Sequence, residues 1–337
     1  MTKLVKSFDF SDVSIAGIST FVSGSKIKNA YFENTFTPKE IASVQKHSGV
    51  EQRYFVDQGE TTENLCYSSA SILLNSLGWD PVTIDGLIFL TQTPTRKLPA
   101  SSCTLQSRLG LPTNSFAFDV NLGCSAYPYG LWLASSLISS GAKRILVLAG
   151  ETTTSIVNPS DRATSMLFGD AGSATAVEYK LDSSLSSYTL GTNGLGADAI
   201  MAKFPQQLFD SSPFVTMNGS KVFEFTLSKV PELISYLKSR STESIDFFCL
   251  HQANKFMLEM IRKKSGLEPG VLPMNIAKFG NTSSASIPLL ITDVVKAEIN
   301  SSTLTLALIG FGVGLSWSTG LVSLSPDCIL LHTDQAC

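Results

Sequence analysis

The sequence predicts an α/β protein in which helices cover both faces of the sheets. Apolar runs of strand length recur along the 337-residue chain, and helix-period segments separate them. The clearest strands are expected at residues 84–90, 142–150, 244–250 and 304–310, and the clearest helices at 63–77, 129–139, 222–239 and 255–265. Continuously apolar strands that alternate with helices are typical of sheets buried on both sides.

The order of these elements indicates an internal duplication. Residues 84–92 resemble 245–252 with one residue inserted, and residues 118–125 resemble 274–282 with a similar offset. Each segment is followed by a predicted helix and an apolar strand. A stretch rich in Ser and Gly, residues 182–196, has the composition of a loop. We therefore expect two similar halves, residues 1–181 and 182–337.

Composition excludes several functional classes. Hydrophobic residues make up 43% of the chain, charged residues 16%, and the net charge is -3, so no global attraction to nucleic acid or to an anionic membrane is expected. The six cysteines and three histidines do not have zinc-ligand spacing. The N-terminus lacks an apolar signal region, and no apolar stretch approaches the ~20 residues of a membrane span. We expect a reduced, cytoplasmic protein without a metal, a cofactor, a nucleic-acid partner or membrane association.

Cys124 lies where an apolar strand, beginning at residue 118, changes abruptly into a helix. Backbone N–H groups and the positive end of a helix dipole favour a thiolate, so this position predicts a lowered pKa and a nucleophilic cysteine. The alternative is a buried structural cysteine, because free Cys packs as a small hydrophobe. Cys124 alone does not decide between the two interpretations.

Two further polar residues are expected near Cys124. His251 follows the predicted strand at 244–250, at the end where open α/β sheets build their sites. Asn281 would occupy, in the second half, the strand-to-helix corner that Cys124 occupies in the first. A satisfied core histidine and an ordinary turn asparagine are the alternatives.

A glycine-rich segment, residues 310–317, directly follows the last clear strand. Its G-x-G-x-G spacing lacks the third glycine position and the following helix of a dinucleotide-binding loop. Glycines at this position would instead let the backbone approach a substrate and direct an N–H group at an oxyanion.

Together these motifs resemble the β-ketoacyl-[acyl carrier protein] synthase III family of thiolase-fold condensing enzymes, and the resemblance extends over nearly the whole chain. The most specific match is His-Gln-Ala-Asn at 251–254 followed by Gly-Asn-Thr-Ser at 280–283. The other matches are Gly-Cys-Ser at 123–125, Asp-Arg at 161–162, and the segments 168–173, 217–223, 284–288 and 310–317. A papain-like protease also uses Cys, His and Asn, but its early nucleophile and Cys-Gly-Ser-Cys-Trp signature are missing.

The resemblance implies a thiolase-like fold with two pseudo-duplicated halves in an α/β/α/β/α arrangement. It implies that Cys124 is acylated, that the backbone N–H groups of Cys124 and Val313 form the oxyanion hole, and that His251 and Asn281 stabilise the enolate of a malonyl thioester. Substrate-binding positions are then Arg162, Asn254, Leu98, Phe311 and Gly312. The expected partners are acyl carrier protein, coenzyme A thioesters and a second copy of the chain.

Three departures from the family pattern concern the substrate. The family's N-terminal Trp, which with the equivalent of Arg162 encloses the adenine of coenzyme A, has no counterpart in residues 39–47. We therefore expect weak coenzyme A binding or a donor on a carrier protein. Leu98 replaces a bulky aromatic residue that closes the acyl pocket from the partner subunit, so a longer or branched acyl group is expected.

The third departure is Phe256, which replaces an arginine associated with carrier-protein docking. The neighbouring Lys255, Arg262, Lys263 and Lys264 form either a docking patch or an ordinary solvated helix face.

The leading interpretation is thus a homodimeric condensing enzyme that makes a β-ketoacyl thioester. One alternative is an acyltransferase of the same fold that passes the acyl group to an alcohol or amine. A non-catalytic partner subunit is the other alternative, but it would be expected to lack the nucleophile.

Overall fold

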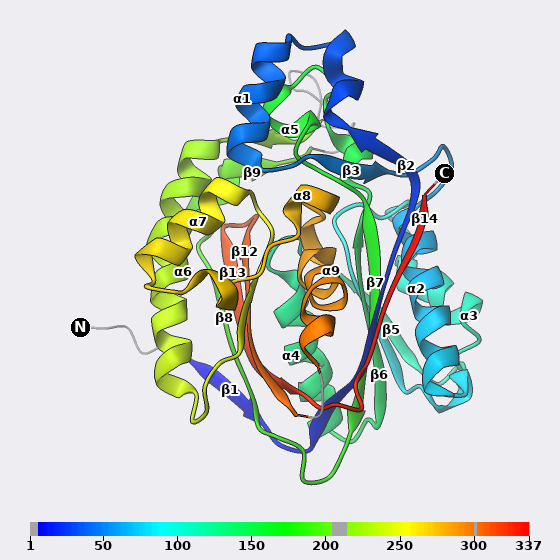
Figure 1. Cartoon of the computed structure of the whole chain (residues 1–337). Helices are drawn as coiled ribbons and strands as arrows, with labels where there is room; N and C mark the ends of the chain where they lie inside the picture. The colour runs from blue at the N-terminus through cyan, green and yellow to red at the C-terminus, as the bar shows by residue number, and fades with distance from the viewer. Residues whose placement is uncertain (1–5, 204–213, 300–301, 337) are drawn as a thin grey trace.

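The protein is built from five layers, in which two β-sheets enclose a central pair of helices and carry further helices on their outer faces (Figure 1). The computed structural model describes residues 6–203, 214–299 and 302–336. Helices α4 (Ala126–Ser139) and α9 (Ser286–Asp293) form the central layer. Helices α2 (Thr62–Leu77) and α3 (Ser101–Arg108) cover one sheet, and α6 (Gly219–Arg240) and α7 (Lys255–Lys264) cover the other. This is the predicted α/β/α/β/α arrangement.

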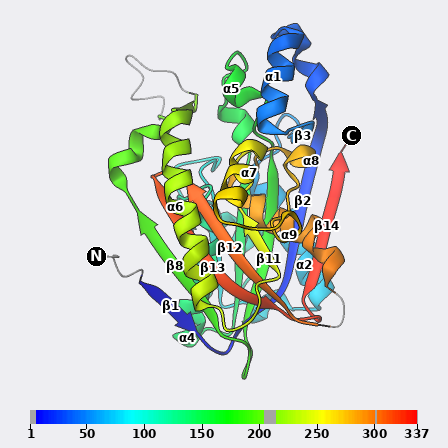
Figure 2. The same cartoon turned by 60° about the vertical axis from the view of Figure 1, so that its left-hand side comes forward.

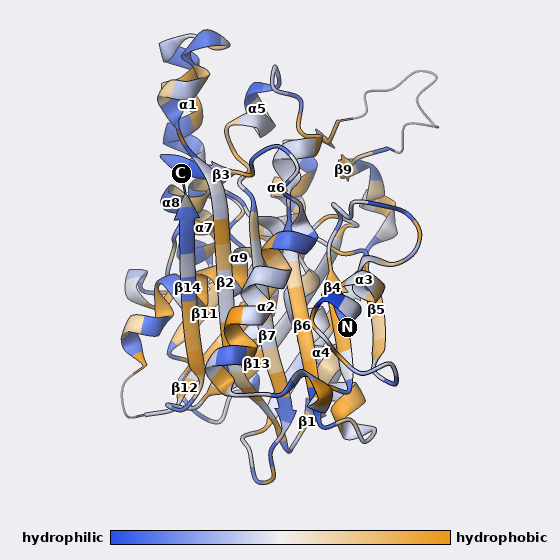
Figure 3. Ribbon diagram, turned by 90° about the vertical axis from the view of Figure 1, so that its right-hand side faces the viewer, coloured by the Kyte–Doolittle hydropathy of each residue, from blue (hydrophilic) through white to orange (hydrophobic). Residues whose placement is uncertain are grey.

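One sheet has seven strands, and its main path runs β14-β2-β7-β6-β4-β5 while β3 pairs with β2 (Figure 3). These strands are β2 (Val13–Lys28), β3 (Gln52–Phe55), β4 (Gly86–Leu90), β5 (Phe116–Val120), β6 (Arg144–Glu151), β7 (Ala171–Tyr179) and β14 (Ile329–Ala336). The other sheet has five strands in the order β1-β8-β13-β12-β11. They are β1 (Ser7–Phe10), β8 (Ser186–Thr192), β11 (Phe247–Leu250), β12 (Leu304–Gly312) and β13 (Ser316–Leu324).

The two sheets share an internal pattern. The order β2-β7-β6-β4 in one corresponds to β8-β13-β12-β11 in the other. In both, the first two pairs are antiparallel and the third pair is parallel. The same strand order and directions are what a duplicated chain would produce. All four strands predicted most clearly are present, as β4, β6, β11 and β12.

One predicted element is wrong. The segment that begins at residue 274 was expected to form a strand equivalent to β5, but it contains the short helix α8 (Ile276–Phe279). Its run of alternating polar and apolar residues is too short to separate a strand from a helical turn. Asn281 therefore follows a helix, and its corner differs from that of Cys124, which follows β5.

The chain termini cross between the sheets. β1, near the N-terminus, pairs antiparallel with β8 of the five-stranded sheet, whereas β14 pairs parallel with β2 of the seven-stranded sheet (Figure 2). Each sheet thus receives an outer strand from the opposite end of the chain.

The remaining elements lie around the ends of the sheets. Helix α1 (Pro38–Ser48) and the short α5 (Arg162–Ser165) lie close together at one end, and β9 (Ile200–Met201) pairs with β10 (Thr216–Met217). In the part of the chain that the structure describes, no helix is long and apolar enough to cross a membrane.

The central helices are buried because their surfaces are largely apolar. Leu131 and Ile138 of α4 pack in the same core as Ile287 and Leu290 of α9 and the inward faces of both sheets. A helix that is apolar on most of its surface is stable only when it is enclosed on all sides. The ends of α4 and α9 are thereby fixed relative to the ends of the strands, where the sequence motifs around Cys124 and Asn281 lie.

Candidate active site

A cavity of about 1290 Å³ opens at the carboxyl ends of the parallel strands and collects the chemically important residues of both halves. Cys124 follows β5, His251 follows β11, and Asn281 lies between α8 and α9, yet all three line this cavity. The remaining predicted residues that line it are Asn254, Phe311, Gly312 and Val313. The structure therefore brings seven of the nine predicted site residues together.

Cys124 is placed by the start of α4 and by the glycines that end β12. An added Cβ at Gly312 would lie 2.7 Å from the Cys124 Cβ, and one at Gly310 would lie 2.8 Å from the Ser125 Cα. Only glycine allows this approach, and the φ of +154° at Gly312 is a further reason for glycine there. The Ser283 hydroxyl lies 3.7 Å from the Cys124 sulfur.

The thiol of Cys124 does not have the lowered pKa that its position in the sequence predicts. Burial raises the pKa of the Cys124 thiol to about 11, and the Glu151 carboxylate also raises it. Hydrogen bonds from the Ser283 side chain and from the backbone of Val313 and Cys124 lower this pKa but do not compensate for the burial. The expectation was wrong because desolvation of the charged form outweighs the helix dipole. The resting nucleophile is a thiol.

His251 is a buried, neutral imidazole with a fixed ring. Its Nδ1 lies 2.8 Å from the Ser286 hydroxyl oxygen, and the Phe311 ring packs edge-on at 5.5 Å between ring centroids. Burial lowers the pKa of His251 to about 3, although a backbone hydrogen bond of Ser283 opposes this shift. When Ser286 donates its hydroxyl proton to Nδ1, Nε2 carries the hydrogen and becomes the donor of the ring.

Asn281 has an amide whose orientation is set by its partners. Its Oδ1 accepts a hydrogen bond of 2.9 Å from the Ser283 backbone N–H, and its Nδ2 donates to the Ala253 carbonyl at 3.3 Å. One hydrogen atom of Nδ2 remains for a ligand. The side chain is only 5% exposed, so this donor acts in a largely desolvated setting.

Three residues of the site were missed in the sequence. Ser283 connects the catalytic candidates, since its hydroxyl lies near Cys124 and its N–H binds Asn281. Ser286 orients His251, and the carboxylate of Glu151 accepts hydrogen bonds from the Gln92 backbone and the Thr93 hydroxyl. Burial raises the pKa of the Glu151 carboxyl to about 7. An acidic residue directly after an apolar strand was the available signal for Glu151, whereas the two serines lay unnoticed within the matched motif.

Two predicted substrate-binding residues lie outside the cavity. Arg162 begins α5, and its Nη1 lies 3.2 Å from Oε1 of Glu40 on α1. Leu98 lies in the loop before α3 and is 85% exposed. At the cavity mouth, Phe256 stacks on Phe223 with ring centroids 5.8 Å apart.

The predicted basic patch is only partly available. Arg262 is paired with Glu259, and the Lys264 ammonium donates to the Leu227 carbonyl. Lys255 and Lys263 also lie on α7, at its first turn and its last turn. In the described part of the chain, no group of three or more His, Cys, Asp or Glu residues is arranged to hold a metal ion.

Comparison with known proteins gives one consistent result. Residues 118–194 match the family 3-oxoacyl-[acyl-carrier-protein (ACP)] synthase III, and residues 238–324 match its C-terminal family. The β-ketoacyl-[acyl-carrier-protein] synthase III of Lactococcus lactis is 32% identical over 294 residues, which cover 83% of this chain and 90% of the relative. Synthase III 2 of Staphylococcus epidermidis is 34% identical over 290 residues, which cover 83% of this chain and 88% of the relative.

Solved structures agree with the sequence comparisons. A 3-oxoacyl-(acyl-carrier protein) synthase from Burkholderia xenovorans has a TM-score of 0.93 and 38% identity, and the match covers 98% of this chain and 99% of that structure. The predicted thiolase-like fold is thereby confirmed. The chain belongs to the 3-oxoacyl-[acyl-carrier-protein] synthase III family and is a thiolase-fold condensing acyltransferase.

Proposed function

We propose that this enzyme joins an acyl group carried on Cys124 to the carbanion of a malonyl thioester and releases a β-ketoacyl thioester and carbon dioxide. The observation that supports this proposal is the convergence of Cys124, His251 and Asn281 in one cavity together with the Val313 backbone. The membership of the family does not favour the alternative, transfer to an alcohol or amine.

In the first half-reaction, the sulfur of Cys124 attacks the carbonyl carbon of an acyl thioester. The backbone N–H groups of Cys124 and Val313, which lower the pKa of the thiol, hold the developing oxyanion. The carbon–sulfur bond to the carrier then breaks, and the thiol proton of Cys124 leaves with the carrier's sulfur. A neutral resting thiol suits this exchange because the proton that Cys124 loses is taken up by the carrier's sulfur in the same step.

In the second half-reaction, His251 Nε2–H and Asn281 Nδ2–H donate to the thioester carbonyl of the malonyl group. An enolate forms when carbon dioxide leaves. Because both donors are buried, their hydrogen bonds stabilise this enolate more strongly than the same bonds would in water. The enolate carbon attacks the acyl carbonyl, the carbon–sulfur bond to Cys124 breaks, and the Cys124 thiolate that leaves takes up a proton from solvent to restore the resting thiol. Neither donor is a competing nucleophile.

The acyl donor is bound to a carrier protein rather than to coenzyme A. Arg162 is held by Glu40, and residues 39–47 contain no Trp; within α1 the Ser43 carbonyl lies 2.8 Å from the His47 Nδ1. An adenine would therefore find no Trp, Tyr or Phe partner from α1. Lys255 and the aromatic surface of Phe256 lie beside the cavity mouth, where an acidic carrier protein would deliver its thioester.

The enzyme works as a cytoplasmic homodimer of duplicated chains whose halves are residues 1–181 and 182–337. Among the described residues, β5 is an outer strand of its sheet with one edge that no strand pairs, and its Phe116 and Phe118 side chains are half-buried. This edge fits pairing with β5 of a second copy. Leu98 is exposed beside Lys97, which lines the cavity, so the partner subunit's Leu98 would close the acyl pocket. Five described cysteines are unpaired, as is usual in a reducing compartment.

The proposed roles predict that H251A and N281A separate the two half-reactions. Each substitution removes one enolate donor, so condensation should slow by roughly a hundredfold to a thousandfold. The rate of Cys124 acylation, measured by intact-protein mass spectrometry, should stay within about threefold of the wild-type rate. A variant that condenses at the wild-type rate would refute this assignment of roles.

The raised pKa of the Cys124 thiol predicts a steep pH dependence of its alkylation. The thiolate fraction below the pKa rises about tenfold per pH unit, so the rate with iodoacetamide should still be rising at pH 10. S283A removes a hydrogen bond that lowers this pKa and should be slower at each pH. A rate that reaches its plateau below pH 8 would contradict the buried-thiol description.

The missing aromatic partner predicts that S43W creates coenzyme A affinity. Base stacking on an aromatic side chain is worth about 1 to 3 kcal/mol, so KM for an acyl-coenzyme A donor should fall by about fivefold to a hundredfold. KM for the acyl-carrier donor should not change, and S43A serves as the control. Tight coenzyme A binding by the wild-type enzyme would show that the donor proposal is wrong.

The edge of β5 predicts the effect of A117P on assembly. Phe116 N–H bonds to the Asp85 carbonyl on the β4 side, so the N–H of Ala117 faces the open edge. Proline removes this donor from both copies, at about 1 kcal/mol per hydrogen bond, and should raise the dimer dissociation constant by about tenfold or more. Light scattering after size exclusion measures this, and circular dichroism checks folding. A wild-type protein that is monomeric at micromolar concentration would overturn the dimer proposal.

A further inference from the structure

The last strand of the chain lies beyond the matched family region, which ends at residue 324. This strand, β14, runs parallel to β2, from Ile329 beside Gly17 to Ala336 beside Gly24. We propose that β14 is a positioning element for condensation, in which His332 and Asp334 hold the turn that presents Asn281. This inference rests on the proposed role of Asn281 as an enolate donor.

The apolar part of this arrangement is a stack of three rings. Phe279, at the end of α8, lies between Tyr54 of β3 and His332 of β14. The Tyr54 and Phe279 centroids are 5.8 Å apart with the rings nearly parallel, and the His332 ring meets Phe279 edge-on at 5.3 Å. Phe279 is only 1% exposed, so its position depends on both neighbours.

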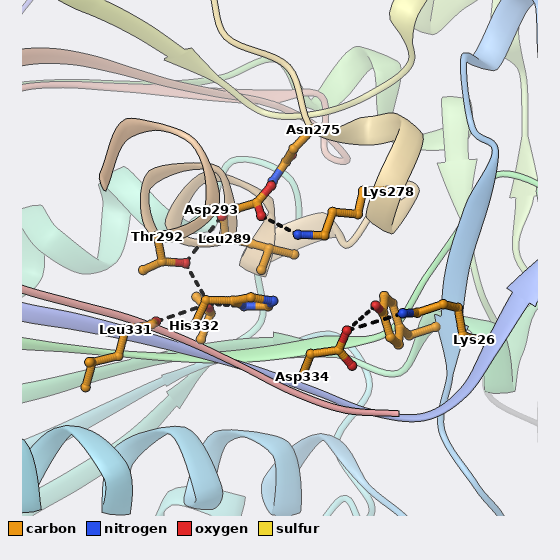
Figure 4. A network of polar contacts seen from close by, with 11 residues as sticks. Lys26, Asn275, Lys278, Leu289, Thr292, Asp293, Leu331, His332 and Asp334 are labelled. Atoms are coloured by element: carbon orange, nitrogen blue, oxygen red, sulfur yellow. Dashed lines mark hydrogen bonds and ion pairs between the residues drawn. The ribbon is translucent and has the colours of Figure 1, made fainter. Parts of the chain in front are cut away.

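Polar contacts fasten β14 directly to β2 and β3, and through Thr20 to α9. His332 and Asp334 alternate with Leu331 and Thr333 and so project from the same face of the strand, toward α8 and α9 (Figure 4). The Tyr54 hydroxyl donates to Asp334 at 2.6 Å, and the Lys26 ammonium lies 3.5 Å from the same carboxylate.

The second fastening is a short chain of hydroxyl groups. His332 Nδ1 lies 3.0 Å from the Thr20 hydroxyl oxygen, which lies 2.6 Å from that of Thr292 on α9. Thr20 and Thr292 are almost completely buried. Hydrogen bonds in such a setting fix geometry closely because an unpaired partner would be costly.

The turn from Phe279 to Asn281 is held from two sides. Helix α8 is only four residues long, too short to be stable by itself. Gly280 has a φ of +67°, and a Cβ there would lie 2.7 Å from the Leu167 carbonyl oxygen, so one side of the turn is pressed against residues 167–169.

On that side the Asn281 N–H donates to the same Leu167 carbonyl, and the Asn281 carbonyl accepts from Gly169. The ring stack supports the other side. Phe279 also packs there against Val22, Ala285 and Leu289, so removing the contact from β14 would loosen this side without abolishing it.

The consequence is specific to one half-reaction. A displacement of about 1 Å at a reacting group costs on the order of a hundredfold in rate. Cys124 is placed by β5, α4 and Gly312, and the Asn281 turn reaches it only through the Ser283 hydroxyl, 3.7 Å from the sulfur. A shift of this turn should therefore impair condensation much more than acylation.

The test compares H332A with L331A in the full-length enzyme. Leu331 lies one position earlier on β14 and faces the opposite side, so L331A weakens the strand without touching Phe279. H332A should lower kcat for condensation by about tenfold or more, with acylation of Cys124 within twofold. L331A should leave both rates within twofold. H332F, which restores a ring against Phe279, should recover most of the condensation rate.

Two outcomes would overturn the inference. One is an equal loss of acylation and condensation in H332A, and the other is an equal effect of L331A and H332A at matched melting temperatures. If H332A does not fold, Y54F makes the same comparison, because it keeps the ring stack and removes only the hydroxyl bound to Asp334.

If Y54F slows condensation by about threefold or more and leaves the acylation rate unchanged, the inference is supported. If Y54F condenses at the wild-type rate, the inference is overturned. N281A separates this result from the proposed function. Selective loss of condensation in N281A but not in the β14 variants would refute only the positioning role, whereas no loss in N281A would refute the role of Asn281 itself.

Discussion

The close approach of β12 to the start of α4 is the constraint on which the rest of the site depends. Gly310 and Gly312 leave room for the backbone and Cβ atoms around Cys124, where any side chain would collide. Two short contacts hold this junction, between the hydroxyls of Ser125 and Ser316 and from the Ser318 hydroxyl to the Ser125 carbonyl, each at 2.6 Å. Because Cys124 comes from one sheet system and Val313, the proposed oxyanion donor, from the other, a looser junction would separate the two.

Desolvation sets the charge state of the whole cavity. The same burial raises the pKa of Cys124 and of Glu151 and lowers the pKa of His251, so each group is shifted toward its neutral form. A resting thiolate–imidazolium pair is therefore disfavoured here. A site of neutral donors suits a reaction whose negative charge appears only during catalysis, since the donors are not already paired with an anion in the resting enzyme.

The sequence predicted the parts of this site that depend on local order. Cys124 and His251 were found because each follows an apolar strand, and Asn281 because it lies in a specific motif. The pKa of Cys124 was predicted in the wrong direction, since desolvation depends on what packs around the thiol and not on its neighbours in the chain. Ser286 and Glu151 were missed for the same reason. The strand expected at residue 274 failed because so short a segment takes its conformation from tertiary packing.

The crossing of the terminal strands explains why residues far from the cavity can affect its chemistry. Strand order within a sheet cannot be read from one sequence, so neither the pairing of β1 with β8 nor that of β14 with β2 was predicted. Strand β1, near the N-terminus, joins the sheet built mainly from the C-terminal half, and β14, near the C-terminus, joins the sheet built mainly from the N-terminal half. Through β14, the final residues of the chain reach the helix that precedes Asn281, while loops at the strand ends determine which thioester enters. The proposed roles thus assign selection of the substrate and alignment of the catalytic groups to different elements, so a change at the cavity mouth should alter the acyl donor without disturbing His251 and Asn281.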